Sequence, residues 1–118
     1  MVNPEDRRRT PRYVSEVPAH YRLLPFDGSP PLDAVTEDLS LEGVRFRCPA
    51  GLRPRSGMLF ELLVPGEQAV RSFGRAAWVQ PLPYHVGYEV GVRFEDQSTA
   101  TRRLIARHLE HRAAAPAA

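Results

Sequence analysis

Apolar and polar residues alternate along most of the chain between residues 17 and 95. This period-two pattern predicts strands with one buried face, because successive side chains of a strand point to opposite sides. The clearest case is the segment 86–95, whose apolar positions are Val86, Tyr88, Val90, Val92 and Phe94. We expect six strands, the first of which lies beyond Tyr13; their ranges are 17–24, 33–38, 44–48, 58–64, 69–80 and 86–95.

Proline and glycine separate the predicted strands. They gather in the loops and turns 25–31, 49–57, 65–68 and 81–84, where a hydrogen-bonded ladder is disfavoured. Gly74 lies within the fifth predicted strand and marks a bulge or a sharp bend there. Short connections without intervening helices favour antiparallel pairing, so we expect a mainly all-β domain that is either a barrel or a sandwich.

One helix is expected after the last strand. Ser98 or Thr99 serves as its N-cap, and it runs to about Arg112. Its narrow apolar stripe consists of Leu104, Ile105, His108 and Leu109. We expect this stripe to close one barrel opening or to dock on a partner, and residues 113–118 to form a disordered tail.

Length and composition are typical of a single small domain. The chain has 118 residues, and we assign 13–112 to the barrel and its helix. No apolar stretch approaches the length of a membrane span, and the single Cys48 excludes an internal disulfide. A cytoplasmic location is the expectation.

The positive charge is small overall but concentrated near the start. The formal net charge is +2, and every basic residue apart from histidine is arginine. Arg7, Arg8, Arg9 and Arg12 lie close together within residues 1–12, a polar, proline-broken segment that we expect to be a flexible arm. Alone, such a cluster is an anion site or a solvated tail.

A second polar motif lies between the second and third predicted strands. Asp38, Ser40 and Gly43 form the pattern Asp-x-Ser-x-x-Gly in the turn 39–43 and its flank. Asp and Ser in such places commonly hydrogen-bond their own backbone, and glycine permits a tight turn or a close approach. We expect Gly43 to serve both backbone conformation and ligand clearance.

Together, the arginine cluster and this turn resemble the bipartite signature of the PilZ domain, a bacterial receptor module for cyclic di-GMP. The resemblance implies a six-stranded antiparallel PilZ-type β-barrel with a C-terminal α-helix and an arginine-bearing arm that closes over the ligand. Arginine suits phosphates and guanine edges, and a carboxylate accepts from the guanine Watson–Crick edge. The implied cyclic di-GMP-binding residues are Arg8, Arg9, Arg12, Asp38, Ser40 and Gly43.

Three further residues are secondary candidates. Arg7 extends the arginine run, so either Arg7 or Arg8 opens the motif. Arg45 follows the turn and is either a phosphate contact or a solvated strand residue. Trp78 ends the fifth predicted strand, where packing in the barrel core is favoured over lining the ligand.

Other functions are weaker alternatives. A PilZ-like adaptor that acts only through protein contact is one, and a small nucleic-acid-binding barrel is another; the small net charge disfavours the latter. The sequence contains no nucleophile elbow or phosphate-binding loop, so we predict that the protein is not an enzyme. His108 and His111 alone do not make a metal site, and no cofactor is expected. We predict a monomer or weak dimer that signals to an unidentified effector protein.

Overall fold

The computed structural model describes residues 13–14, 16–49, 51–63, 66, 68–95 and 97–110. The predicted arm, with its four arginines, and the predicted tail lie outside these described residues.

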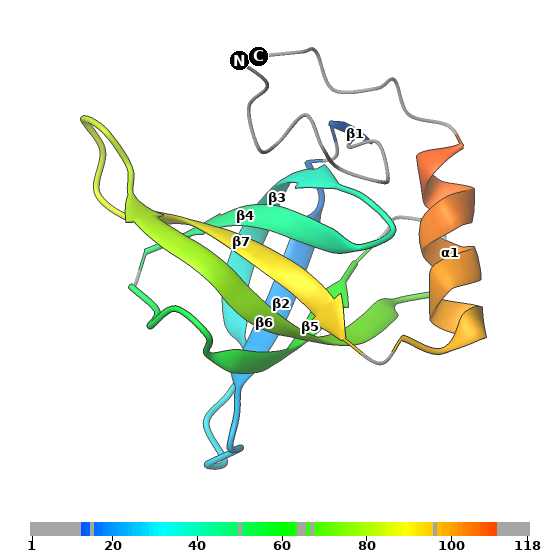
Figure 1. Ribbon diagram of the computed structural model, residues 1–118, viewed down its shortest axis with the longest axis horizontal. Helices are drawn as coiled ribbons and strands as arrows, with labels where there is room; N and C mark the ends of the chain where they lie inside the picture. Colours follow the sequence, from blue (N-terminus) through cyan, green and yellow to red (C-terminus); the bar gives the residue numbers. More distant parts are fainter. Residues whose placement is uncertain are drawn as a thin grey trace.

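Six antiparallel strands close into a barrel (Figure 1). They are hydrogen-bonded in the spatial order β3-β2-β5-β6-β7-β4, and pairing of β3 with β4 completes the circle. The predicted barrel is therefore confirmed, and the sandwich is excluded. A two-residue strand, β1 (Tyr13–Val14), adds to one side of β3. The six barrel strands are β2 (Pro18–Leu23), β3 (Leu32–Leu39), β4 (Gly43–Cys48), β5 (Gly57–Leu62), β6 (Val70–Pro81) and β7 (Tyr88–Glu95).

The barrel interior is filled by the alternating apolar side chains that the sequence pattern predicts. The Phe46 ring lies between the rings of Tyr21 and Phe60, at centroid distances of 5.3 and 5.1 Å. Burial, together with contact and a hydrogen bond to the Cys48 side chain, raises the pKa of Tyr21, so its phenol stays neutral. Such tilted aromatic contacts give the small core a defined packing.

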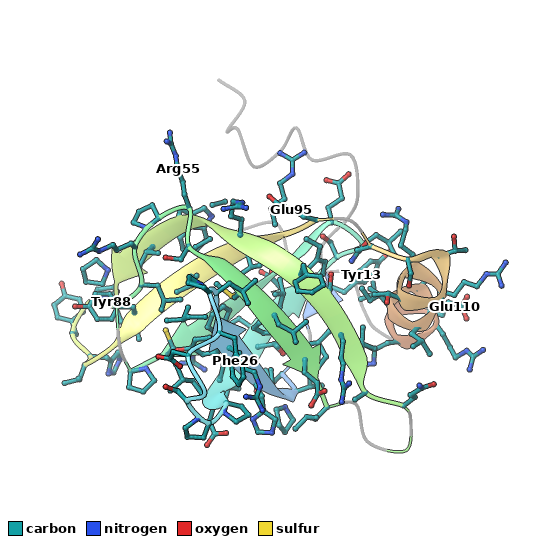
Figure 2. The ribbon with its side chains drawn as sticks, turned by 90° about the horizontal axis from the view of Figure 1, so that it is seen from below. Tyr13, Phe26, Arg55, Tyr88, Glu95 and Glu110 are labelled. Atoms are coloured by element: carbon teal, nitrogen blue, oxygen red, sulfur yellow. The ribbon has the colours of Figure 1, made fainter. Side chains whose placement is uncertain are left out.

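Helix α1 (Thr99–Leu109) stands beside the barrel in Figure 1. Ser98 is its N-cap, because the Ser98 side chain accepts a hydrogen bond from the Thr101 backbone N–H. The helix buries Ile105 and Leu109 and packs against β6. Figure 2 shows Tyr88 and Glu95 at opposite ends of β7, with α1 on the Glu95 side. Among the described residues, no helix is long and apolar enough to cross a membrane.

Three details differ from the sequence prediction. The last strand starts at Tyr88, and Val86 is 96% exposed, so its assignment to the buried face was wrong. Gly87, at φ +119°, interrupts the extended backbone that the alternation suggested. The β6 bulge is at Ala77 rather than Gly74, since the register with β7 shifts between Ala76 and Trp78.

The helix is also shorter than expected: it ends at Leu109, before Arg112. Leu109 is the last residue of the apolar stripe, so packing against the barrel supports the helix no further.

Candidate ligand-binding site

The turn between β3 and β4 is closed by a serine side chain. The Ser40 hydroxyl oxygen accepts hydrogen bonds from the backbone N–H groups of Glu42 and Gly43, at 3.1 and 3.2 Å. The Ser40 N–H donates to the Gly43 carbonyl at 2.9 Å. The predicted serine turn is thus confirmed, and the buried Ser40 gives this corner of the barrel a fixed shape.

Gly43 is required by a close approach of two strands. A Cβ atom at this position would lie 2.2 Å from the Val92 carbonyl oxygen in β7. Its φ angle is not in the left-handed region, so the backbone requires glycine here for the close approach of the strands and not for a left-handed conformation. The glycine lets β4 start directly against β7, and a hydrogen bond of 2.8 Å from Phe94 N–H to the Glu42 carbonyl fixes that contact.

Asp38 lies beside this turn near the end of β3, and its carboxylate is almost completely buried. The Arg45 Nη2 atom lies 2.8 Å from Asp38 Oδ2. These two residues are register partners on the outer face of the barrel, next to the inward-facing pair Thr36 and Phe46. The site therefore presents an acceptor that is already oriented by a cation.

Two further carboxylates surround the same arginine. Glu37 Oε2 lies 3.3 Å from Arg45 Nε, without hydrogen-bond geometry, and Glu89 Oε1 lies 3.7 Å from Arg45 Nη1. Glu37 also pairs with Arg47 Nε at 2.9 Å. Burial and the adjacent Glu89 carboxyl raise the pKa of Glu37, while the two arginines offset part of that effect. Arg45 is consequently an ion-paired residue whose side chain stays partly exposed.

Trp78 is on the outside of the barrel, so the prediction of core packing is wrong. Its register partner Gly91 alternates with the inward-facing Val90 and Val92, which places Trp78 and Gly91 on the outer face. The indole lies on Gly91: a Cβ there would be 2.4 Å from both Cε2 and Nε1. The bulge at Ala77 reverses the alternation of β6 and turns Trp78 outward.

These residues form one strip across four strands. Asp38 pairs with Arg45, Arg45 with Gly91, and Gly91 with Trp78, so acceptor, cation and aromatic ring follow one another over β3, β4, β7 and β6. We call this set the outer strip. Figure 1 shows β4, β7 and β6 side by side on one side of the barrel. Arg93 is exposed beside the outer strip, opposite Gly43 in the β4–β7 register.

The arm arginines Arg7, Arg8, Arg9 and Arg12 lie outside the described residues. Their attachment point is nevertheless defined, because the residue after Arg12 begins β1. Tyr13 pairs with Leu39, and Val14 pairs with Asp38. The described chain therefore starts next to the serine turn, at the Asp38 end of the outer strip.

Sequence reasoning did not assign Glu37, Glu89, Gly91 or Arg93 to the candidate site, although Gly91 and Arg93 lie in a segment, 91–94, that looks like family positions. The alternation in the last strand did put Glu89, Gly91 and Arg93 on its polar face, but nothing in it indicated which neighbours they would meet. Glu37 had no such signal, since it is the extra residue of a bulge in β3. Within the described part of the chain, no three metal-binding side chains gather into a possible metal site.

The whole barrel and helix match a known family. A model of the PilZ domain family matches residues 6–111. No curated protein matches the chain by sequence.

Solved structures of that family have a similar fold. The PilZ domain of YcgR from Escherichia coli, solved with c-di-GMP, is 17% identical, with a TM-score of 0.73, and the match covers 88% of this chain and 89% of that one. MotI, an inhibitor of motility from Bacillus subtilis, is 12% identical with a TM-score of 0.71; the match covers 95% of this chain and 58% of MotI. The PilZ domain of CeSA from a cellulose-synthesizing bacterium is 22% identical with a TM-score of 0.60, over 85% of this chain and 98% of that domain.

Proposed function

Because this chain belongs to the PilZ domain family, we propose that it is a receptor for cyclic di-GMP. The pairing of β1 with β3 is the observation that most supports this proposal. It places Tyr13, the residue that follows Arg12 in the sequence, opposite Leu39 beside the serine turn. The proposed ligand-binding residues are Arg8, Arg9, Arg12, Asp38, Ser40 and Gly43.

Each part of the site has a distinct proposed role. The Asp38 carboxylate accepts from the N1–H and N2–H groups of one guanine, while Arg45 keeps that carboxylate oriented. The arm arginines, with Arg7 as a secondary contact, bind the phosphates and stack on a base. Trp78 offers an indole on the outer strip for stacking of the second guanine.

The expected affinity is around micromolar. Four charge-assisted hydrogen bonds at about 1.5–3 kcal/mol each, plus base stacking at about 1–3 kcal/mol per base, give a gross gain on the order of 10–15 kcal/mol. Association of the two molecules and ordering of the arm cost several kcal/mol of this gain. The remainder, about 8 kcal/mol, corresponds to a micromolar dissociation constant.

We propose that the closed arm presents a new surface to an effector protein, and that the receptor acts in the bacterial cytoplasm as a monomer or weak dimer. It performs no catalysis in this scheme. Control of motility or biofilm formation is the proposed output, in line with the described role of MotI as an inhibitor of motility.

Isothermal titration with cyclic di-GMP tests the receptor proposal. The variants Asp38→Ala and Arg12→Ala should each weaken binding at least about tenfold, the loss expected for one charge-assisted contact. Matched controls are Asp33→Ala on the same strand and Arg71→Ala, both distant from the outer strip in the sheet register. Equal losses in the control variants, or no loss in Asp38→Ala, would contradict the assigned site.

The second candidate is an adaptor that binds a protein without the nucleotide. Tyr84 and Val86 favour it, because both are almost fully exposed on the β6–β7 loop. Beside them is a hollow of about 430 Å³ lined mainly by apolar side chains, among them Val35 and Leu82. The absence of any cyclic di-GMP binding in the titration would favour this adaptor.

A further inference from the structure

Arg93 is the one arginine of the six barrel strands whose side chain has no polar partner within the described part of the chain. Arg22 lies over the Phe26 ring and donates to the Ser29 carbonyl oxygen. The other arginines of these strands form ion pairs with carboxylates; they are Arg45, Arg47, Arg71 and Arg75. The folded barrel therefore leaves the exposed guanidinium of Arg93 available to a ligand from outside.

The position of Arg93 is next to the proposed binding site. It alternates with the inward-facing Val92 and Phe94 in β7, so its side chain is on the outer face, as the outer strip is. Its register partner in β4 is the motif residue Gly43, and Gly91 of the outer strip lies two residues before it on the same face. Residues two apart in a strand are about 7 Å from each other. A long arginine side chain can cover that distance to a ligand on the strip.

Arg45, the arginine within the outer strip, is less available for such a contact. Its Nη2 atom lies 2.8 Å from Asp38 Oδ2, and its Nε atom lies 3.3 Å from Glu37 Oε2. A phosphate contact by Arg45 would require it to leave these carboxylates, which would then be left without part of their compensating charge. Arg93 has only water to give up, so the same contact opposes binding less.

Resting on the proposed function, we propose that Arg93 binds a phosphate of cyclic di-GMP from the barrel side and contributes to the affinity independently of the arm. The charge around Arg93 supports a phosphate as its partner. Its register partner in β6 is Arg75, so two guanidinium groups start from adjacent strands. Arg75 has a carboxylate partner, Glu95, at 3.0 Å, and one positive charge of this pair of arginines remains. An anion gains more from that charge than the neutral edge of a base does.

Two properties distinguish a phosphate contact from a guanine contact. Attraction between two full charges at an exposed site is screened by salt, so loss of the contact should reduce the salt dependence of the affinity. A phosphate also accepts a point charge such as a lysine ammonium, whereas the flat edge of a guanine is matched by the planar fork of arginine. Lysine at position 93 should therefore support a phosphate contact.

The test is isothermal titration of the full chain with cyclic di-GMP at low and at high salt. Arg93→Gln should weaken binding about tenfold at low salt, the loss of one charge-assisted contact, and less at high salt. Arg93→Lys should recover most of that loss. Urea unfolding of both variants should match the wild type, because no described contact is removed.

Arg53→Gln is the matched control. It also removes one exposed arginine without a described side-chain partner, but on the loop between β4 (Gly43–Cys48) and β5 (Gly57–Leu62). This variant has the same net charge as Arg93→Gln, so it reports the effect of general electrostatic attraction alone. Its affinity should equal that of the wild type at both salt concentrations.

Three results would overturn the inference. Unchanged affinity in Arg93→Gln, with wild-type binding intact, would exclude the contact and leave the receptor function standing. A loss that Arg93→Lys does not recover would assign Arg93 to a guanine edge instead of a phosphate. Equal losses in Arg93→Gln and Arg53→Gln would reduce the effect to net charge. No binding by the wild type would contradict the receptor function itself, and the Arg93 contact would fall with it.

Discussion

Replacement of Gly43 by alanine tests whether this motif glycine is needed by the barrel itself. The new Cβ would lie 2.2 Å from the Val92 carbonyl oxygen, 3.2 Å from its carbonyl carbon and 3.4 Å from Arg93 Cα. All three atoms belong to the backbone, so no side-chain rotation relieves the contact. Strands β4 and β7 must separate by at least about 1.2 Å before the carbon and oxygen reach ordinary van der Waals contact.

The energetic effect follows from this displacement. Overpacking in a tight site costs about 1–3 kcal/mol. The two hydrogen bonds beside Gly43, Ser40 N–H to its carbonyl and Phe94 N–H to Glu42, are 2.9 and 2.8 Å long and would stretch beyond the normal range. Their loss adds about 0.5–1.5 kcal/mol each, and alanine in a strand recovers about 0.5–1 kcal/mol relative to glycine. We expect Gly43→Ala to lower the free energy of unfolding by about 2–4 kcal/mol.

Urea unfolding followed by circular dichroism measures this change. Gly57→Ala is the matched control, because its Cβ would meet only side-chain atoms at 3.9 Å, so that variant should be neutral or slightly stabilised. If Gly43→Ala unfolds at the same urea concentration as Gly57→Ala, the close approach is not a constraint on the fold. The glycine would then have to be explained by ligand clearance.

Three further predictions concern the same corner of the molecule. Ser40→Ala removes the acceptor of two backbone N–H groups at a buried position, so it should lower the free energy of unfolding by about 1–3 kcal/mol. Urea unfolding measures this change, and an unchanged midpoint would show that the hydroxyl does not support the turn. Gly91→Ala should push the indole of Trp78, the only tryptophan, off β7 and shift its fluorescence emission to longer wavelength with little loss of stability; an unchanged spectrum would contradict the contact. Raising the salt concentration should weaken cyclic di-GMP binding in titrations, because arginines meet its phosphates; a salt-independent affinity would exclude that contribution.

The sequence was sufficient to predict the barrel, because the alternation of apolar and polar residues indicates directly which face of a strand is buried. Met58, Phe60 and Leu62 on β5 and Phe46 on β4 all fill the interior as predicted. The same pattern failed at Val86, since alternation does not reveal where hydrogen bonding to the neighbouring strand begins. Gly87, at φ +119°, lies directly before that boundary.

The candidate site was less predictable because it depends on two bulges. The extra residue Ala77 reverses the facing of Trp78, and the extra residue Glu37 brings a third carboxylate to Arg45. A bulge is set by the register between strands and not by the composition of one strand. The motif residues Asp38, Ser40 and Gly43 were found from their spacing, but their contacts across β4 and β7 required the folded chain.

A nuclear magnetic resonance titration of the ¹⁵N-labelled chain with cyclic di-GMP would test the central claim most directly. The account predicts that shifts concentrate on the amides of residues 38–43, on Gly91 and on the Trp78 indole N–H, while Glu61 and Arg71 on the β5–β6 side remain unchanged. Unchanged spectra at millimolar ligand, or shifts centred on β2 and β5, would contradict a cyclic di-GMP site on the outer strip.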